Sequence, residues 1–134
     1  RERAAASGPA VFLSERNFDM KPQTFTWKKL TADELTRVYL DEMHRDFPPS
    51  ELKPLSMILN SEAADMAHTW GVFEGETLVS YLLMVRPMGC EVSQLDYFSV
   101  LPAYRSTGIG ARLLAALPAH EEGVKANFAL ITSD

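Results

Sequence analysis

The stretch QLDYFSVLPAYRSTGIGARLLAAL, from Gln94 to Leu117, contains the pattern that predicts the fold. Residues 94–100 are rich in aromatic and β-branched side chains, which is typical of a strand. Ile109, Leu113 and Leu117 then recur at helical spacing, with alanines between them. The stretch therefore predicts a strand and a helix, joined by a short connection that contains the residues RSTGIG.

This connection, residues 105–110, has the features of an anion-binding loop. Gly108 and Gly110 carry no Cβ atom, so a ligand can approach the backbone closely. The N–H groups in the first turn of the following helix have no intrahelical acceptor, and the helix dipole adds a partial positive charge there. The sequence therefore predicts a seat for a phosphate group at the start of this helix.

The same residues form a motif that resembles the acetyl-CoA-binding motif of the GNAT superfamily of N-acetyltransferases. The motif reads V-x-P-x-Y followed by R-x-x-G-x-G, and its residues are Val100, Pro102, Tyr104, Arg105, Gly108 and Gly110. The resemblance implies that the loop backbone cradles the CoA pyrophosphate and that the preceding strand bonds the pantetheine arm. The CoA-binding residues that it implies are Phe98, Ser99, Val100, Arg105, Ser106, Thr107, Gly108, Ile109, Gly110 and Ala111. We expect the loop backbone to contribute more than the Arg105 side chain.

Other phosphate-binding patterns fit less well. The third glycine of a dinucleotide fingerprint would fall on Leu113, and the glycines lie well beyond the strand end. The sequence contains no G-x-x-x-x-G-K-[ST] pattern. An unrelated α/β nucleotide-binding protein with the same glycine loop, or an ordinary strand–helix turn, remains an alternative.

The composition limits the class of protein. A length of 134 residues, with 46% hydrophobic and 23% charged residues, predicts one soluble globular domain. A net charge of -5, without a run of Lys or Arg, argues against nucleic acid or an anionic membrane as a partner. Cys90 is the single cysteine, which excludes an internal disulfide and fits a cytoplasmic location. The three histidines show no metal-binding spacing.

The rest of the chain predicts alternating strands and helices. Thr31 and Glu34 form a capping box that opens a helix, which should end at the Pro48-Pro49 pair. We expect Ser50 to cap a second helix, Glu51 to Asn60. The expected strands are Gln23–Leu30, Trp70–Phe73, Leu78–Val85, Gln94–Val100 and Phe128–Ile131. The resulting order, β-α-α-β-β-β-α-β, predicts an α/β (α+β) fold like that of GNAT proteins: a mixed, mostly antiparallel sheet with helices on both faces.

Both ends of the chain depart from this pattern. Residues 1–19 show no periodicity and are expected to be a disordered leader, so that the domain comprises residues 20–134. A GNAT domain would continue with another helix and two strands, so the resemblance implies a domain that is incomplete at its C-terminus. An unpaired edge at the strand 128–131 would favour a homodimer. Pro118 is expected to end the motif helix near Leu117 or to open a separate turn.

Asp96 is the candidate catalytic residue. Relatives often carry a general base on the motif strand, and Asp96 can titrate where the neighbouring Gln94 cannot. Burial beside Tyr97 and Phe98 would raise the pKa of this carboxyl group. An ideal strand would place Gln94, Asp96, Phe98 and Val100 on one face and Leu95, Tyr97 and Ser99 on the other. The alternative is that Asp96 only pairs with a neighbouring strand or caps a loop.

The other polar residues near the expected site have a structural interpretation. Glu42, His44, Asp46 and Glu51 surround the first helix–helix connection, which borders the acceptor site in GNAT proteins, and are interpreted as solvated helix ends. The residue that serves as general acid in this superfamily is a Tyr on the helix that the sequence lacks, and neither Tyr97 nor Tyr104 replaces it. Tyr104 is expected to pack beside the motif loop.

The leading functional hypothesis is an acetyl-CoA-dependent N-acetyltransferase, which moves an acetyl group from the CoA thioester to an amine by direct attack. Acetyl-CoA is the expected co-substrate, and the amine acceptor is not identified by the sequence. The alternative is a non-catalytic half domain of the GNAT type that binds CoA or a protein partner.

Overall fold

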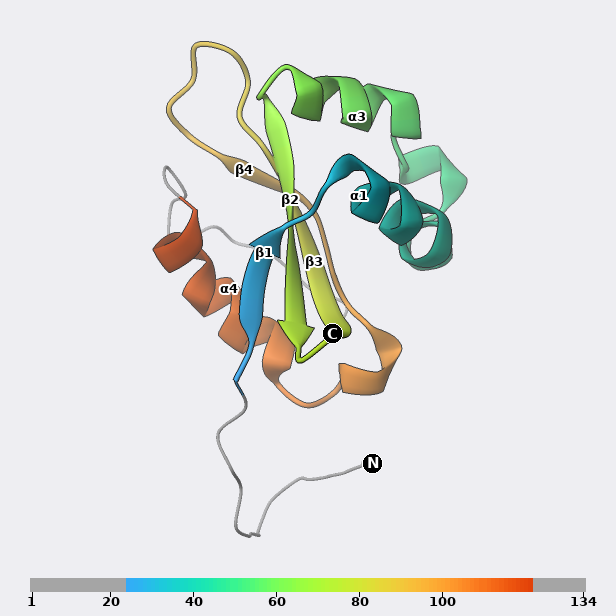
Figure 1. Cartoon of the computed structure of the whole chain (residues 1–134), viewed down its shortest axis with the longest axis vertical. Helices are drawn as coiled ribbons and strands as arrows, with labels where there is room; N and C mark the ends of the chain where they lie inside the picture. The colour runs from blue at the N-terminus through green and yellow to red at the C-terminus, as the bar shows by residue number, and fades with distance from the viewer. Residues whose placement is uncertain (1–23, 122–134) are drawn as a thin grey trace, which may run out of the picture.

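Four antiparallel strands organise the computed structural model, which describes residues 24–121 (Figure 1). They pair in the order β1-β2-β3-β4 and comprise β1 (Thr26–Lys29), β2 (Ala67–Glu74), β3 (Thr77–Val85) and β4 (Gln94–Val100). Six consecutive residues of β3, 79–84, are buried, because the strand has neighbours on both sides and helices over both faces. The predicted bounds of β4 are confirmed, and β1 and β2 are confirmed with shifted ends.

Helices cover both faces of the sheet, as predicted. The helical run α1 (Ala32–Val38), η1 (Tyr39–Met43) and α2 (His44–Asp46) lies on one face together with α3 (Leu55–Ala63), and α4 (Ile109–His120) lies on the other (Figure 1). Each face has its own apolar core. The first contains Leu35, Met43, Tyr81, Leu83 and Tyr97, and the second contains Val72, Leu82, Met84, Ile109 and Leu113.

The first helix begins where the capping box predicts. The Glu34 N–H donates to Thr31 Oγ1 (3.2 Å), and the Thr31 N–H donates to Glu34 Oε1 (2.9 Å). The following segment was not predicted, because Tyr39–Met43 form a π-helical turn within the run. This turn keeps Tyr39 and Met43 in the core while Leu40 is exposed.

The prediction that Ser50 caps a helix from Glu51 to Asn60 is wrong. Residues Pro49–Glu51 form a single 3-10 turn, and α3 begins only at Leu55, with Pro54 as its N-cap. A proline disfavours the helical conformation in the residue before it, so a helix that begins at Glu51 cannot run through Pro54 without a break.

The expectation that Pro118 ends the motif helix is also wrong, because α4 continues through Pro118 to His120. The proline lies in the last helical turn, where it removes one hydrogen bond and no further turn has to be built on it. Leu117, just before it, is fully buried and holds this end of the helix on the sheet. The predicted leader, residues 1–19, and the predicted strand Phe128–Ile131 lie outside the described residues.

A buried carboxylate fixes the C-terminal end of α4. The Glu121 side chain is 3% exposed and accepts hydrogen bonds from Trp70 Nε1 (2.8 Å), from Ser93 Oγ (2.8 Å) and from the His68 ring. Burial raises the pKa of Glu121, but the hydrogen bonds from His68, Trp70 and Ser93 lower it by more, so the pKa lies below its usual value of 4.5. The carboxylate therefore links α4 to β2 and to the connection between β3 and β4.

We predict that Glu121→Gln lowers the free energy of unfolding at pH 7 by about 1–3 kcal/mol, because the amide group presents a donor to neighbours that are donors themselves. Since the pKa of Glu121 is lowered in the folded state, its contribution is present above pH 4.5 and is lost as the pH falls below that value. The difference between the two proteins should therefore shrink on acidification. Urea unfolding across this pH range measures it, with Glu76→Gln in the exposed hairpin turn as the control. An equal loss in both variants would contradict the prediction.

Candidate functional site

The loop between β4 and α4 has the backbone geometry of an open turn. Gly108 is the N-cap of α4 and has φ 80° and ψ 2°, which is the left-handed conformation that favours glycine. A Cβ atom built on Gly108 would meet nothing within 4 Å. The space in front of the first turn of α4 is therefore open on the side of Gly108. Ser106 also adopts a positive φ, of 65°.

Tyr104 attaches this loop to the hairpin between β2 and β3. It closes the 3-10 turn η3 (Pro102–Tyr104), its ring packs on the core under α4, and its hydroxyl donates to Glu74 Oε1 (2.9 Å). Burial and the bond to the Glu74 carboxylate both raise the pKa of Tyr104. The hydroxyl therefore stays protonated, and Tyr104 packs beside the motif loop as predicted.

The end of β4 presents backbone groups at the edge of the described sheet. The Leu101 N–H donates inward to the Val79 carbonyl of β3 (2.8 Å). Because backbone groups alternate along a strand, the Ser99 groups also point toward β3, where its carbonyl accepts from Ser80 Oγ (2.8 Å). The groups of Phe98 and Val100 consequently face the outer edge, where the sequence predicts pantetheine binding.

The Arg105 side chain turns back along β4. Its Nε donates to the Val100 carbonyl (2.6 Å), and one terminal nitrogen donates to Ser99 Oγ (3.1 Å) and to Asp46 Oδ1 (2.9 Å). Arg105 is therefore hydrogen-bonded to the protein through Nε and through one terminal nitrogen. Its side chain braces the loop, a role that the motif alone does not reveal.

Asp46 differs from the solvated helix end that the sequence suggested. Its side chain is only 5% exposed, and it accepts hydrogen bonds from Arg45, from Tyr81 and from Arg105. Burial alone raises the pKa of Asp46, but the bonds from Arg45, Tyr81, Arg105 and Ser99 outweigh it, so the pKa lies below its usual value. Burial and the Asp46 carboxylate raise the pKa of Tyr81 well above its usual range, so this hydroxyl remains a donor.

A bulge in β4 changes the predicted faces of this strand. Leu83 of β3 pairs with Tyr97, but the next residue, Met84, pairs with Leu95, so Asp96 is the extra residue. Leu95 consequently packs with Phe98 on the α4 side, while Tyr97 packs on the α1 side. The expectation that Leu95 shares a face with Tyr97 is therefore wrong, because the alternation of an ideal strand breaks at Asp96.

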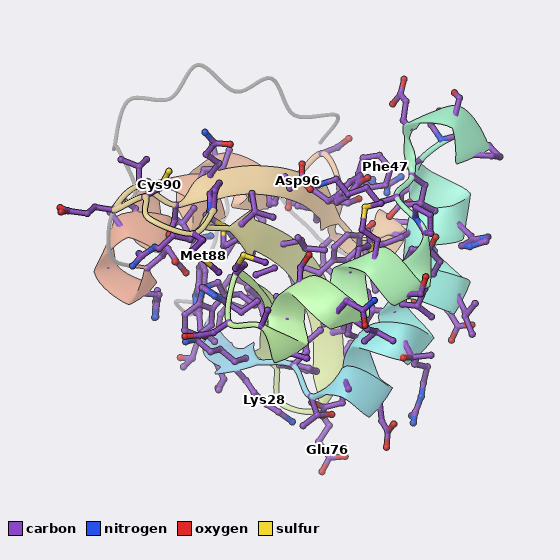
Figure 2. The ribbon with its side chains drawn as sticks, turned by 90° about the horizontal axis from the view of Figure 1, so that it is seen from above. Lys28, Phe47, Glu76, Met88, Cys90 and Asp96 are labelled. Carbon is purple, nitrogen blue, oxygen red and sulfur yellow. The ribbon has the colours of Figure 1, made fainter. Side chains whose placement is uncertain are left out.

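Asp96 lies at the surface, so the expectation that it is buried is wrong. Figure 2 shows it between the β3–β4 loop, which carries Cys90, and the segment that carries Phe47. Its Oδ2 atom is 2.7 Å from the ammonium group of Lys53, and the two side chains are 27% and 43% exposed. The bulge thus directs the carboxylate toward the segment between α2 and α3.

Two tyrosine hydroxyls hold the backbone that carries Lys53. Tyr97 Oη accepts from the Lys53 N–H (2.9 Å) and donates to the Glu51 carbonyl (2.8 Å), and Tyr39 Oη donates to the Lys53 carbonyl (2.6 Å). Tyr97 therefore has a structural role in this segment. Sequence reasoning missed Lys53, because its partners lie 14, 43 and 44 residues away.

Other features of the described residues do not point to a second site. A shallow groove of about 260 Å³ separates α1 from the β2–β3 hairpin and is lined by residues such as Leu30, Glu34, Glu42 and Phe73. Within residues 24–121, no group of His, Cys, Asp and Glu could hold a metal ion. In the same range, no helix has the length and apolar character that a membrane span requires.

Comparison with known proteins identifies the class. The family model of the acetyltransferase (GNAT) family matches residues 27–129, and the chain belongs to this family. The match includes the strand, the loop and the helix of the motif, so the resemblance found in the sequence is confirmed. No curated protein sequence gives a significant match.

Solved structures of GNAT proteins share the fold. A GNAT-family protein from Bacteroides thetaiotaomicron superposes with a TM-score of 0.59 at 19% identity, over 71% of this chain and 55% of its own. The ribosomal-protein-S18-alanine N-acetyltransferase of Escherichia coli gives 0.54 at 17% identity, over 72% and 59%. A Clostridium acetobutylicum protein described as an acetyltransferase, with acetyl-CoA in its structure, gives 0.52 at 11%, over 76% and 79%. The chain thus matches little more than half the length of the first two structures.

Proposed function

We propose that this chain is the donor-binding part of an acetyl-CoA-dependent N-acetyltransferase, which transfers an acetyl group from CoA to an amine by direct attack. The observation that carries the proposal is the left-handed Gly108 at the start of α4, with open space at its Cβ position, next to β4, the last strand of the described sheet. This arrangement suits a ligand with a phosphate at one end and an extended arm at the other.

The donor would be held mainly by backbone. The loop from Arg105 to Ala111, with Ser106, Thr107, Gly108, Ile109 and Gly110 between them, would receive the pyrophosphate at the positive end of the α4 dipole. The edge groups of Phe98 and the Val100 N–H, with Ser99 between them, would bond the amide groups of the pantetheine arm, while the Val100 carbonyl accepts from Arg105 Nε. The net charge of -5 does not oppose this assignment, because backbone N–H donors supply the local positive potential.

The reaction requires a proton acceptor near the attacking amine. The amine nitrogen forms a bond to the thioester carbonyl carbon, the carbon–sulfur bond breaks, and the amine proton passes to a base while the thiolate leaves as CoA. Asp96 is the proposed base, acting directly or through water, since the bulge brings its carboxylate out of the strand. A strand N–H at the same edge could stabilise the oxyanion.

One observation favours the alternative of a non-catalytic CoA-binding domain. The Lys53 ammonium lies 2.7 Å from Asp96 Oδ2, on the oxygen that a substrate proton would have to reach. Catalysis by Asp96 therefore requires this exposed ion pair to open, which costs little in water. The two functions differ in turnover and agree in CoA binding, so they can be separated experimentally.

The donor assignment is tested with Gly108→Asn. Asparagine tolerates a positive φ better than other residues, and its side chain would enter the open space where the phosphate is proposed to lie. We expect calorimetry to show acetyl-CoA binding by the wild-type chain and at least about 10-fold weaker binding by the variant, since the loss of two phosphate bonds exceeds 1.4 kcal/mol.

Gly89→Asn is the matched control for this test. Gly89 has φ 84° and open space around its Cβ position, but it lies in the turn after β3. Equal acetyl-CoA affinity in Gly108→Asn and Gly89→Asn would reject the phosphate seat.

The catalytic assignment is tested with Asp96→Asn. A positioned base contributes about 100- to 10,000-fold in rate, so turnover should fall within that range while acetyl-CoA affinity stays constant. CoA release can be followed with a thiol reagent in a Cys90→Ser background, because Cys90 is an exposed free thiol. The acceptors should include small amines, aminoglycosides, peptide N-termini and lysine peptides.

Lys53→Met provides the companion measurement, because it frees the Asp96 carboxylate without changing it. We expect turnover to be retained or raised in Lys53→Met. Superimposable pH–rate profiles for the wild type and Asp96→Asn would show that Asp96 is structural. Acetyl-CoA binding without turnover of any acceptor would favour the non-catalytic domain.

A further inference from the structure

The buried carboxylate of Asp46 joins three separate parts of the chain. Its Oδ1 atom accepts from Arg45 Nε and from a terminal nitrogen of Arg105, each at 2.9 Å. Its Oδ2 atom accepts from the Tyr81 hydroxyl (2.7 Å) and from a terminal nitrogen of Arg45 (3.2 Å). Asp46 thus connects the end of α2 to the centre of β3 and to the loop before α4.

The loop before α4 needs such an attachment because its conformation is strained. Ser106 has φ 65°, and a non-glycine residue in the left-handed region brings its Cβ atom too close to the following carbonyl oxygen. Such residues persist where the surrounding structure holds them. Arg105 directly precedes Ser106, and its guanidinium is bound at three points on two elements.

The Asp46–Arg105 pair is the charged one of these three contacts. Val100 and Ser99 offer neutral acceptors on β4, whereas Asp46 offers a carboxylate whose side chain is 5% exposed. All three bonds have a charged donor, but only the bond to Asp46 also has a charged acceptor, so the attraction between opposite charges adds to it. Removing the Asp46 charge therefore weakens the hold on Arg105 more than the loss of either neutral acceptor.

We propose that Asp46 is a positioning residue for the donor substrate: its carboxylate fixes the Arg105 side chain, and Arg105 fixes the loop that receives the CoA pyrophosphate. This inference rests on the proposed function. Asp46 does not itself reach the phosphate in this arrangement, because its two oxygens are occupied by Arg45, Tyr81 and Arg105. Its effect on acetyl-CoA passes through the shape of the loop.

The test compares Asp46→Asn with Tyr81→Phe in the full 134-residue chain. Asn keeps the shape of Asp46 but removes the charge that holds Arg105. Phe at position 81 removes a hydrogen bond from the same carboxylate and leaves the Asp46–Arg105 pair in place. Both variants should lose stability in urea unfolding, so Tyr81→Phe controls for damage to the buried cluster.

Two readouts separate positioning from stability. In the chain without ligand, hydrogen exchange of the amides of residues 105–110 should accelerate in Asp46→Asn and stay near wild type in Tyr81→Phe. Calorimetry should show acetyl-CoA affinity reduced about 10-fold in Asp46→Asn, the size of a typical coupling between linked groups. It should be unchanged in Tyr81→Phe.

A double-mutant cycle tests the route through Arg105. If Asp46 acts through Arg105, then Asp46→Asn combined with Arg105→Gln should bind acetyl-CoA no more weakly than Arg105→Gln alone. Additive losses would overturn the proposal, and so would equal behaviour of Asp46→Asn and Tyr81→Phe in both readouts. Should Asp46→Asn fail to fold, Asp46→Ser, which also removes the charge, replaces it in the same measurements and is compared with Tyr81→Phe by the same criteria.

Failure of the proposed function has a different signature. A wild-type chain that binds no acetyl-CoA would reject that function, whereas the exchange measurement, which needs no ligand, would still decide whether Asp46 fixes the loop. The positioning role alone would be rejected by a different result. In that case the wild type binds acetyl-CoA, and Asp46→Asn shows wild-type hydrogen exchange in the loop and wild-type acetyl-CoA affinity.

Discussion

A buried carboxylate must be matched by donors, and this requirement at Asp46 joins the end of α2 to the loop before α4. An unpaired charge at 5% exposure would be strongly destabilising, so the end of α2 has to lie where Arg105 and Tyr81 can reach it. Arg105 belongs to the loop before α4, which packs on the other face of the sheet (Figure 1). The same interaction therefore fixes the position of the candidate donor loop relative to the helices on the first face of the sheet.

The local parts of this structure could be predicted from sequence because their signals are local. The aromatic and β-branched run of β4 and the capping box at Thr31 are each specified by adjacent residues. The motif loop is also local, and the match over residues 27–129 confirms the family that it indicates.

The missed features depend on residues that are distant in sequence. Asp46 and Arg105 are 59 residues apart, so the pattern around Asp46 shows only a polar helix end before two prolines. The β4 bulge depends on how the strand pairs with β3, and alternation within β4 alone predicts an unbroken strand. The start of α3 has a local signal in Pro54, but Ser50 presents a competing N-cap pattern four residues earlier.

The bulge and the Asp46 network together divide the candidate site into two halves with different rigidity. On the donor side, Arg105, Tyr104 and the buried end of β4 are held by several hydrogen bonds, so a phosphate would meet a preorganised loop. On the side of Asp96, an exposed ion pair with Lys53 is the contact nearest to the proposed chemistry, and exposed pairs contribute little stability. An approaching amine could therefore displace Lys53 at small cost, because it brings the same kind of cation to the same carboxylate. If Asp96 is the base, Lys53 occupies in the ligand-free chain the place that the acceptor amine takes before it loses its proton.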